Sequence, residues 1–389
     1  MTLSRPDWTI TSSKPPPHGM LRFTVESALL LVMVLVVFRA FFAEGYMIST
    51  GSMAPSLLGY HQRVCCPACR FEFARGASPQ ELPRQSAIAA TDIAADPWKE
   101  VSTRCPNCGT AVPTAELPVI EGDQLMVRKH EFAWRDPQRW EVTVFRNPNL
   151  PVQAYVKRVV GLPGERISIV DGDVYANGVL QRKPLEVQRA LRIPVSDHDH
   201  QPAPSDPDWR PRWLPVAAPN CWTGDGTRFQ SNCDPQNRAA PQAIDWIEYR
   251  HWIRAGGHHR STVSIDDWPV ELPEPVEQRD GFSLDTSAGT LTAIGALPAE
   301  TIAMWMARSS SEPFRDALGR LYLRSHQPPI SDVCAYNHPE SNPNDHPIHD
   351  LMLELNLTPR TATGQFVMSM HDGCHELRCT LDFEQHEVR

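Results

Sequence analysis

Basic residues are in the minority in this chain of 389 residues. Lys and Arg number 37 against 46 for Asp and Glu, so the formal net charge at pH 7 is −9. Proteins that bind nucleic acid normally present a basic face, and we therefore expect no nucleic-acid partner. The ten cysteines are too few for a dense disulfide scaffold. Their spacing must decide what they do.

Two common catalytic motifs are absent from the sequence. It contains no Gly-x-Ser-x-Gly, the turn that exposes the serine nucleophile of α/β-hydrolases. It also contains no His-Glu-x-x-His, the helical pair of zinc ligands found in metalloproteases. The clustered histidines are consequently predicted to be loop residues and not metal ligands. They are His198, His200, His258 and His259.

A long apolar run does occur near the N-terminus. It is uninterrupted from Ala28 to Phe38 and continues past Arg39 to Ala43. As a helix this run would measure roughly 24 Å, and extension back to Phe23 would bring it to the ~30 Å of a bilayer core. Arg39 near one end could reach the lipid headgroups. The sequence therefore predicts a transmembrane anchor over residues 22–43.

Positive charges precede this anchor and outnumber negative ones: they are Arg5, Lys14 and Arg22, against Asp7. The positive-inside rule then predicts that residues 1–21 are cytoplasmic and that everything after the anchor lies outside the cytoplasm. The chain would be a single-pass protein of the cell inner membrane, in contact with lipid. A cleavable secretory signal is the alternative, but bulky Phe41 would stand at position −3 of a cut after Ala43.

A candidate nucleophile follows the anchor. Ser52 stands after Gly51 and three residues before Pro55, a pattern typical of a tight turn that presents a hydroxyl and bare backbone N–H groups. A serine needs a base to become nucleophilic, and no histidine lies in a recognisable serine-protease context. A different base must therefore be found. The alternative is that Ser52, like most serines in turns, is merely solvated.

Lys157 is the candidate base. Residues 140–145 and 154–165 alternate like two strands, and 166–170 and 174–176 continue them into an antiparallel meander. Lys157 lies in an apolar part of the second strand, where removal from water favours the neutral amine. A neutral lysine can accept a proton from a serine. The alternative is an ordinary edge-strand lysine that opposes aggregation.

Three motifs in this order resemble bacterial type I signal peptidases over residues 22–184. They are Ile48–Leu57 with the serine, Gly122–Val127, and Tyr155–Glu165 with the lysine. The resemblance implies a mainly β fold, with an antiparallel β catalytic domain over residues 44–190 behind one transmembrane helix. It implies a serine endopeptidase that cuts the signal peptides of exported preproteins and needs no cofactor for catalysis.

The resemblance also implies a role for each site residue. Ser52 would attack the scissile carbonyl and Lys157 would take its proton. The backbone N–H of Ser52 and the hydroxyl of Thr50 would form the oxyanion hole, and the strand around Tyr155 and Val156 would pair with the extended substrate.

The family's closing motif, of the Gly-Asp-Asn…Asp-Ser-Arg type, is missing from residues 185–389; the polar stretch Ser341–Asp345 lacks the pattern. Because that motif orients the lysine, an inactive relative that acts as a membrane-anchored binding protein remains an alternative. A self-cleaving serine-lysine protease of the SOS-repressor type also shares the dyad. The anchor and the lack of a DNA-binding helix pair disfavour it.

An insert over residues 60–118 separates the first two motifs. It holds two Cys-x-x-Cys pairs, Cys66 with Cys69 and Cys105 with Cys108, which resemble a zinc ribbon and predict a structural Zn²⁺. Neighbouring Cys65 leaves the choice of ligand open. Cross-paired disulfides are the alternative, since the predicted compartment is oxidising.

The C-terminal half is predicted in two parts. Residues 191–275 are Pro-rich and irregular. Residues 276–389 are predicted to form a β-sandwich, because short period-two segments recur at 289–294, 350–357, 364–370 and 374–383. Two further cysteine pairs are candidate disulfides: Cys221 with Cys233, and Cys374 with Cys379.

Overall fold

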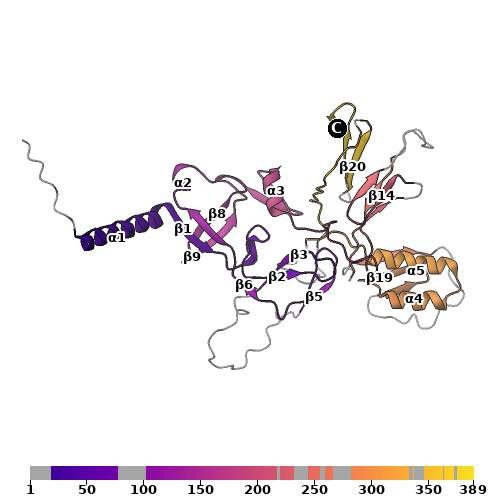
Figure 1. Ribbon diagram of the computed structural model, residues 1–389. Coiled ribbons are helices and arrows are strands. Elements are labelled where there is room, and N and C mark those ends of the chain that lie inside the picture. The colour runs from indigo at the N-terminus through magenta and orange to yellow at the C-terminus, as the bar shows by residue number, and fades with distance from the viewer. Residues whose placement is uncertain are drawn as a thin grey trace, which may run out of the picture.

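The fold is taken from a computed structural model of the chain. The structure describes residues 19–77, 102–216, 220–231, 244–254, 259–265, 282–332, 336, 346–361, 363–371 and 375–389. Strands are many and short, helices few, and one apolar helix stands at the N-terminal side (Figure 1). The predicted mainly β class behind one apolar helix is thereby confirmed.

The apolar helix consists of α1 (Met20–Val37) and a π-helical turn, η1 (Phe38–Phe42). Together they span 23 residues with a mean hydropathy of 2.3, and none of these residues is buried. The helix is long and apolar enough to cross a membrane. It projects from one end of the molecule (Figure 1). The predicted cytoplasmic stretch before it lies outside the described residues, apart from its last three.

Two antiparallel strand pairs and a small meander follow the helix in space. The pairs are β1 (Ala43–Met47) with β7 (Gln124–Arg128), and β8 (Val142–Asn147) with β9 (Leu150–Arg158). The meander is β10 (Ile167–Val170), β11 (Asp173–Ala176) and β12 (Val179–Leu180). Two short helices complete this part: α2 (Glu131–Trp134) and α3 (Leu185–Leu191).

The meander is set by two tight turns. Asp171 and Gly172 have φ of 50° and 86°, and Asn177 and Gly178 have φ of 52° and 80°. Two consecutive residues with positive φ match the twist of the flanking strands, which is why Asp-Gly and Asn-Gly are favoured in two-residue hairpins. The antiparallel meander predicted over residues 166–170 and 174–176 is confirmed here.

The segment between β1 and β2, residues 48–60, is here called the Ser52 loop; it contains one turn of 3-10 helix, η2 (Gly51–Met53). Backbone groups crowd it from two sides. A Cβ atom on Gly59 would lie 2.5 Å from the carbonyl carbon of Thr50, and one on Gly122 would lie 1.9 Å from the carbonyl oxygen of Ile48. Only glycine permits such close backbone approach.

The insert forms two small β units. One is a three-stranded sheet of β3 (Glu72–Gly76), β2 (His61–Cys65) and β6 (Val119–Ile120), and the other is a hairpin of β4 (Ser102–Arg104) and β5 (Ala111–Pro113). The turn after β2 and the turn within the hairpin each carry one pair of cysteines.

Residues 191–254 are mostly irregular, as their proline content predicts, with two short pairings. These are β13 (Trp213–Pro215) with β16 (Ile247–Tyr249), and β14 (Trp222–Gly224) with β15 (Phe229–Ser231). His198 and His200 lie in turns and His259 precedes a strand without being in one, as predicted; His258 lies outside the described residues. Cys221 is disulfide-bonded, and its candidate partner Cys233 is not among the described residues.

The region predicted to be a β-sandwich has a different architecture. Its three-stranded sheet is β17 (Arg260–Ser264), β19 (Thr290–Ile294) and β18 (Phe282–Asp285). Helices α4 (Ala299–Arg308) and α5 (Glu312–Ser325) pack with it around one apolar core. The α5 side chains in that core recur at helical spacing: Phe314, Ala317, Leu318 and Leu321. Within the described part of this region the sheet is covered by helices and not by a second sheet, so the sandwich prediction is wrong.

Two details of the C-terminal prediction also need correction. Residues 350–357 form no strand; Asp350 and Glu354 make ion pairs with Lys183 and with Arg189 of α3 instead. The final strands are confirmed as β20 (Gln365–His371), β21 (Glu376–Asp382) and β22 (Glu387–Val388). Cys379 on β21 is a free thiol, so its predicted bridge to Cys374 is wrong.

The crowding around Gly122 yields a first prediction. Gly122→Ala places a methyl group against backbone atoms that cannot rotate away, and we expect it to lower the free energy of unfolding by about 3 kcal/mol. Gly45→Ala on β1 is the control, since its Cβ would meet only Leu125 O at 4.0 Å. It should change stability by no more than about 0.5 kcal/mol. Denaturant titration of both variants in detergent tests this, and equal stabilities would contradict it.

Candidate active site

Ser52 lies at the centre of η2, with its side chain exposed to solvent. The backbone N–H of Ala54 donates to the carbonyl of Gly51 at 3.0 Å and closes the turn. Thr50 before the turn is extended, with φ −124° and ψ 153°. The change from extended to helical backbone at Gly51 projects the Ser52 hydroxyl outward.

Asp123 fixes the Ser52 loop by three hydrogen bonds. Its side chain accepts the N–H of Leu58 at 2.7 Å. Its own N–H donates to the carbonyl of Leu58 at 2.9 Å, and its carbonyl accepts the N–H of Ile48 at 2.9 Å. Both ends of the loop are thus bound to one residue, immediately beside the glycine that permits the close approach.

Lys157 lies near the end of β9, opposite Thr143 of β8, and is half-buried. Strand β9 contacts η2 directly. The Lys157 side chain reaches the loop and its Nζ donates to Ser52 Oγ at 2.5 Å. Two residues separated by 105 positions therefore form a hydrogen-bonded serine–lysine pair.

The strand that carries the lysine is held at its end by Trp140 and Arg158. Trp140 N–H donates to the carbonyl of Val159 at 2.7 Å, and the Arg158 guanidinium donates to the carbonyl of Trp140 at 2.7 Å and to Ser56 Oγ at 3.4 Å. Ser56 in turn donates to the carbonyl of Ala190. Arg158 thereby joins the lysine strand to the Ser52 loop and to α3.

The turn after β9 carries an ion pair. Arg139 contacts Glu165 at 2.5 Å, and Glu165 also accepts the N–H of Leu162 at 2.7 Å. The backbone N–H of Leu162 and the Arg139 guanidinium together lower the pKa of Glu165 below its usual range. The carboxylate is charged near neutral pH and keeps the turn closed.

The other predicted site residues lie around the serine–lysine pair. Thr50 is exposed two residues before Ser52. Tyr155 and Val156 lie on β9 and are half-buried, and the Tyr155 ring stacks on Phe145 with centroids 6.1 Å apart. Among the described residues β9 pairs with β8 on one edge and with no strand on the other.

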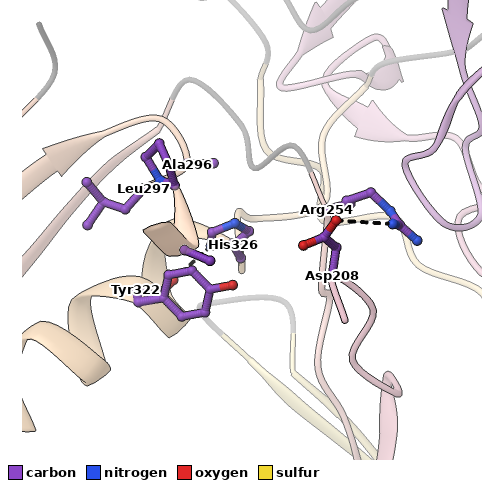
Figure 2. Close-up of a pocket in the computed structure, with 8 residues that line it drawn as sticks. Asp208, Arg254, Ala296, Leu297, Tyr322 and His326 are labelled. Atoms are coloured by element: carbon purple, nitrogen blue, oxygen red, sulfur yellow. Dashed lines mark hydrogen bonds and ion pairs between the residues drawn. The ribbon is translucent and has the colours of Figure 1, made fainter. Parts of the chain in front are cut away.

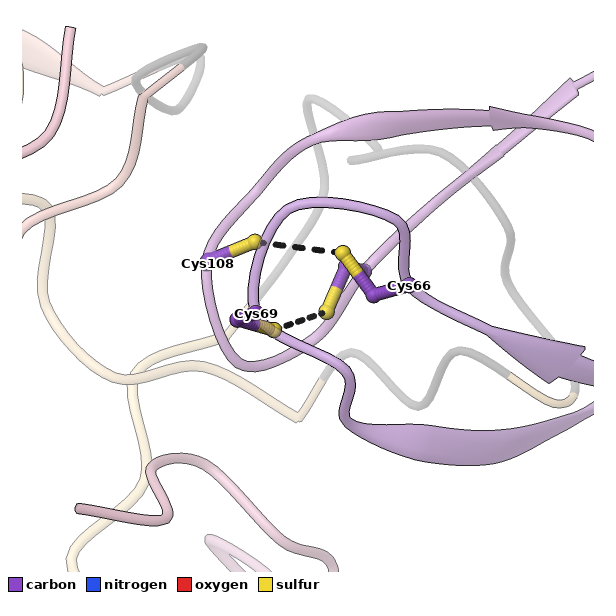
Figure 3. A group of neighbouring side chains, drawn as sticks. Cys66, Cys69 and Cys108 are labelled. Atoms are coloured by element: carbon purple, nitrogen blue, oxygen red, sulfur yellow. Dashed lines mark hydrogen bonds between the residues drawn. The ribbon is translucent and has the colours of Figure 1, made fainter. Parts of the chain in front are cut away.

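The four predicted metal ligands also come together. The Sγ atoms of Cys66, Cys69, Cys105 and Cys108 all lie within 4.8 Å of one another, and the four side chains are buried (Figure 3). Cys65 is exposed and is not in the group. Hydrogen bonds from Cys105 and Cys69 lower the pKa of Cys108, while hydrogen bonding and burial raise the pKa of Cys105.

The supports of the site were not predicted from the sequence. Asp123 and Arg158 were noted there only as members of motifs, without the hydrogen bonds that each makes to the Ser52 loop. The contact of α3 with Ser56 was not foreseen either. For Asp123, the signal available in the sequence was its position directly after a glycine inside a short motif.

A separate pocket of about 240 Å³ lies in the C-terminal half (Figure 2). It is lined by Asp208 and Arg254 on one side, and on the other by Tyr322 of α5 and by His326, the residue after that helix. Burial lowers the pKa of His326, so this ring is neutral near pH 7. Neither Ser52 nor Lys157 lines this pocket, and it plays no part in their pairing.

Comparison with known proteins supports the predicted resemblance. A family described as "Signal peptidase, peptidase S26" matches residues 110–216. Signal peptidase I of Leptolyngbya laminosa is 32% identical over 109 residues, which cover 26% of this chain and 46% of that protein. Signal peptidase I of Rickettsia typhi is 44% identical over 88 residues, covering 17% of this chain and 33% of that protein. No solved structure matches the chain.

These matches confirm that the chain resembles type I signal peptidases. The chain spans less than half the length of the curated relatives that it matches. The family match includes Asp123 and Lys157 but begins after Ser52. The lysine motif is therefore covered by the family match, and the serine is joined to it by geometry.

The hydrogen bonds of Asp123 yield the second prediction. Asp123→Ala leaves the partly buried N–H of Leu58 without its acceptor, and we expect it to lower the free energy of unfolding by about 1–3 kcal/mol. Asp123→Asn keeps a carbonyl oxygen at this position and should cost less than about 1 kcal/mol. Denaturant titration compares the two; an asparagine variant as unstable as the alanine variant would contradict the assignment.

Proposed function

We propose that this chain is a membrane-anchored serine endopeptidase that removes signal peptides from exported preproteins. The observation that carries the proposal is the 2.5 Å contact between Lys157 Nζ and Ser52 Oγ. The match of residues 110–216 to the signal peptidase family supports it independently.

The chemistry requires Lys157 to be neutral when the reaction starts. Its Nζ then accepts the proton of the Ser52 hydroxyl while Oγ attacks the carbonyl carbon of the scissile peptide bond. The tetrahedral intermediate collapses, the C–N bond breaks, and the Lys157 ammonium gives its proton to the leaving amine. A water molecule, deprotonated by the same lysine, then hydrolyses the ester and frees Ser52.

The negative oxygen of that intermediate needs hydrogen-bond donors. The Ser52 N–H and the Thr50 hydroxyl are the donors that we assign to it. Their placement on either side of Gly51 supports the assignment, because the extended-to-helical change there leaves both residues exposed. Donors of this kind typically contribute a factor of about 10²–10³ in rate.

The edge of β9 that pairs with no strand among the described residues is the proposed binding site for the substrate backbone. An extended peptide can add to an unpaired strand edge by main-chain hydrogen bonds. Tyr155 and Val156 lie on this strand one or two positions before Lys157, so a bound peptide would pass directly over the serine–lysine pair.

The helix Met20–Phe42 is the proposed membrane anchor, with the remainder of the chain on the extracytoplasmic side. Its length, its mean hydropathy of 2.3 and the lack of any buried residue in it support an anchor. The disulfide-bonded state of Cys221 agrees with an oxidising compartment on that side. The signal peptides of the substrates would lie in the same bilayer.

The missing closing motif favours the alternative of an inactive relative, in which the chain would only bind exported proteins. The supports of β9 speak against that alternative. Arg158 and Trp140 hold the lysine end of the strand, and Ser56 connects it to α3, so Lys157 has a defined position without that motif.

The dyad gives the third prediction. Ser52→Ala and Lys157→Ala should each reduce preprotein cleavage at least about 10³-fold, and the double variant should be no worse than either, because the two residues act as a unit. Lys157→Arg should also fail, since an arginine cannot lose its proton near neutral pH. Cleavage by the purified protein in detergent is the measurement.

Ser168→Ala, an exposed serine on β10, is the matched control and should cleave normally. A Lys157→Arg variant that still cleaves would refute the mechanism. A folded wild-type chain that binds preproteins without cleaving any would establish the inactive relative.

The anchor gives the fourth prediction. Protease added to spheroplasts should digest residues after the helix and leave a short membrane-bound N-terminal fragment, because positive charge precedes the helix and should retain the N-terminus inside. Immunoblots against tags at the two termini distinguish the products. Complete protection, or release of a soluble form that begins near residue 44, would exclude the proposed topology.

A further inference from the structure

We propose that Cys66, Cys69, Cys105 and Cys108 bind one Zn²⁺ as four thiolates, and that this metal joins the insert to the C-terminal half. The proposal concerns the architecture of the chain and is independent of the peptidase activity.

The geometry of the four sulfurs is that of a closed tetrahedral site. Zn–S bonds of about 2.3 Å place tetrahedral sulfurs about 3.8 Å apart. Cys66 and Cys108 are separated by 3.5 Å, Cys69 and Cys105 by 3.6 Å, and no pair exceeds 4.8 Å. All four side chains are at most 3% exposed, so no position is left open for water. Such closure is typical of structural and not of catalytic zinc.

The two cysteine turns are built alike. Cys66 N–H donates to the carbonyl of Phe71 and Arg70 N–H to that of Cys66, at 2.9 and 2.8 Å. In the second turn the N–H of Cys105 donates to the carbonyl of Thr110 at 2.9 Å, and the N–H of Gly109 donates to the carbonyl of Cys105 at 2.8 Å.

The residue after the second cysteine has positive φ in both turns, 62° at Arg70 and 75° at Gly109. Each turn also joins two antiparallel strands, β2 to β3 and β4 to β5. Two like turns face each other across the sulfurs, as two halves of one metal site would.

The surroundings of the sulfurs are arranged for a negative centre. Four thiolates and Zn²⁺ carry a net charge of −2. Arg212 lies over the ring of Trp209, which shares a core with the four cysteines, and it is buried, with 3% exposure. Arg212 donates to the carbonyls of Trp252 and Val195 and forms no ion pair with a carboxylate among the described residues. A buried cation without a counter-charge is costly, and a zinc tetrathiolate supplies that charge.

Side chains next to the cysteines contact the sulfurs directly. Thr110 Oγ1 lies 3.1 Å from Cys108 Sγ, and Asn107 Nδ2 donates to Cys69 Sγ at 3.8 Å. Hydrogen bonds to ligand atoms are a usual feature of metal sites, where they orient the ligands.

The site lies where three parts of the chain meet. The four cysteines share one apolar core with Val64 and Val112 of the insert and with Trp209 and Trp252 of the irregular segment. Tyr322 of α5 packs against the same core. A metal here would fix the insert to residues that follow Cys108 by more than a hundred positions. The strand β2 also runs from the Ser52 loop to Cys66, and His61 at its start contacts the carbonyl of Gly59 through Nδ1 at 2.9 Å.

The first measurement is metal content of the full-length protein purified in detergent. We expect one zinc per chain, lost in Cys69→Ser and Cys105→Ser and retained in Cys65→Ser, the matched control next to the site. Protein grown with Co²⁺ should show the visible bands and the thiolate charge-transfer absorption of a tetrahedral tetrathiolate. Iron in place of zinc, or bridges among these four cysteines in non-reducing mass spectrometry, would overturn the proposal.

The second measurement tests the structural role of the metal. It does not require that the Cys69→Ser and Cys105→Ser variants fold. A chelator that removes the metal from wild-type protein should lower the melting temperature and expose residues 190–330 to limited proteolysis; Zn²⁺ should reverse both effects. Unchanged protease sensitivity after metal loss would overturn the role in joining the two parts.

Ser52→Ala separates this proposal from the peptidase activity, since it should be inactive with a full zinc content. A wild-type chain that cleaves preproteins without any metal would refute the zinc site alone. A zinc-loaded chain that cleaves none would refute the peptidase alone.

Discussion

The close backbone contact between the Ser52 loop and residues 122–123 is the constraint on which the candidate site depends. It removes any side chain at Gly122 and places the three hydrogen bonds of Asp123 across the two ends of the loop. A loop of thirteen residues is thereby reduced to one conformation at the point where η2 forms. The 2.5 Å contact with Lys157 follows, because β9 lies against that turn.

Much of this site could be predicted from the sequence because its residues lie in short local patterns. The hairpin turns at Asp171 and Asn177, the strand with Lys157 and the paired cysteines each have a signature within a dozen residues. The residues that support the site have no such local signature. The reach of Arg158 to Ser56 and the closure of the loop by Asp123 join positions 102 and 65 residues apart, and such pairs become visible only in three dimensions.

The C-terminal half shows where the period-two pattern misleads. Residues 350–357 alternate in polarity, yet their acidic side chains pair with Lys183 and α3, so they bind a helix and not a neighbouring strand. Conversely, the apolar residues of α5 recur at intervals of three and four, the helical period, from Phe314 to Leu321. This helical period, set beside the strands of the same region, predicts a sheet covered by helices.

Chain length between the anchor and the serine limits where the chemistry can occur. Ser52 follows Phe42, the last residue of the apolar helix, by ten positions. Even fully extended they span no more than about 36 Å. Strand β1 and the turn η2 shorten this reach further, and the pairing of β1 with β7 ties the rest of the domain to the same short segment. With the helix in a bilayer, the serine–lysine pair therefore stays near the membrane surface. Under the proposed function, a substrate would have to present its cleavage site within the same layer, as a protein still held by its own signal peptide would.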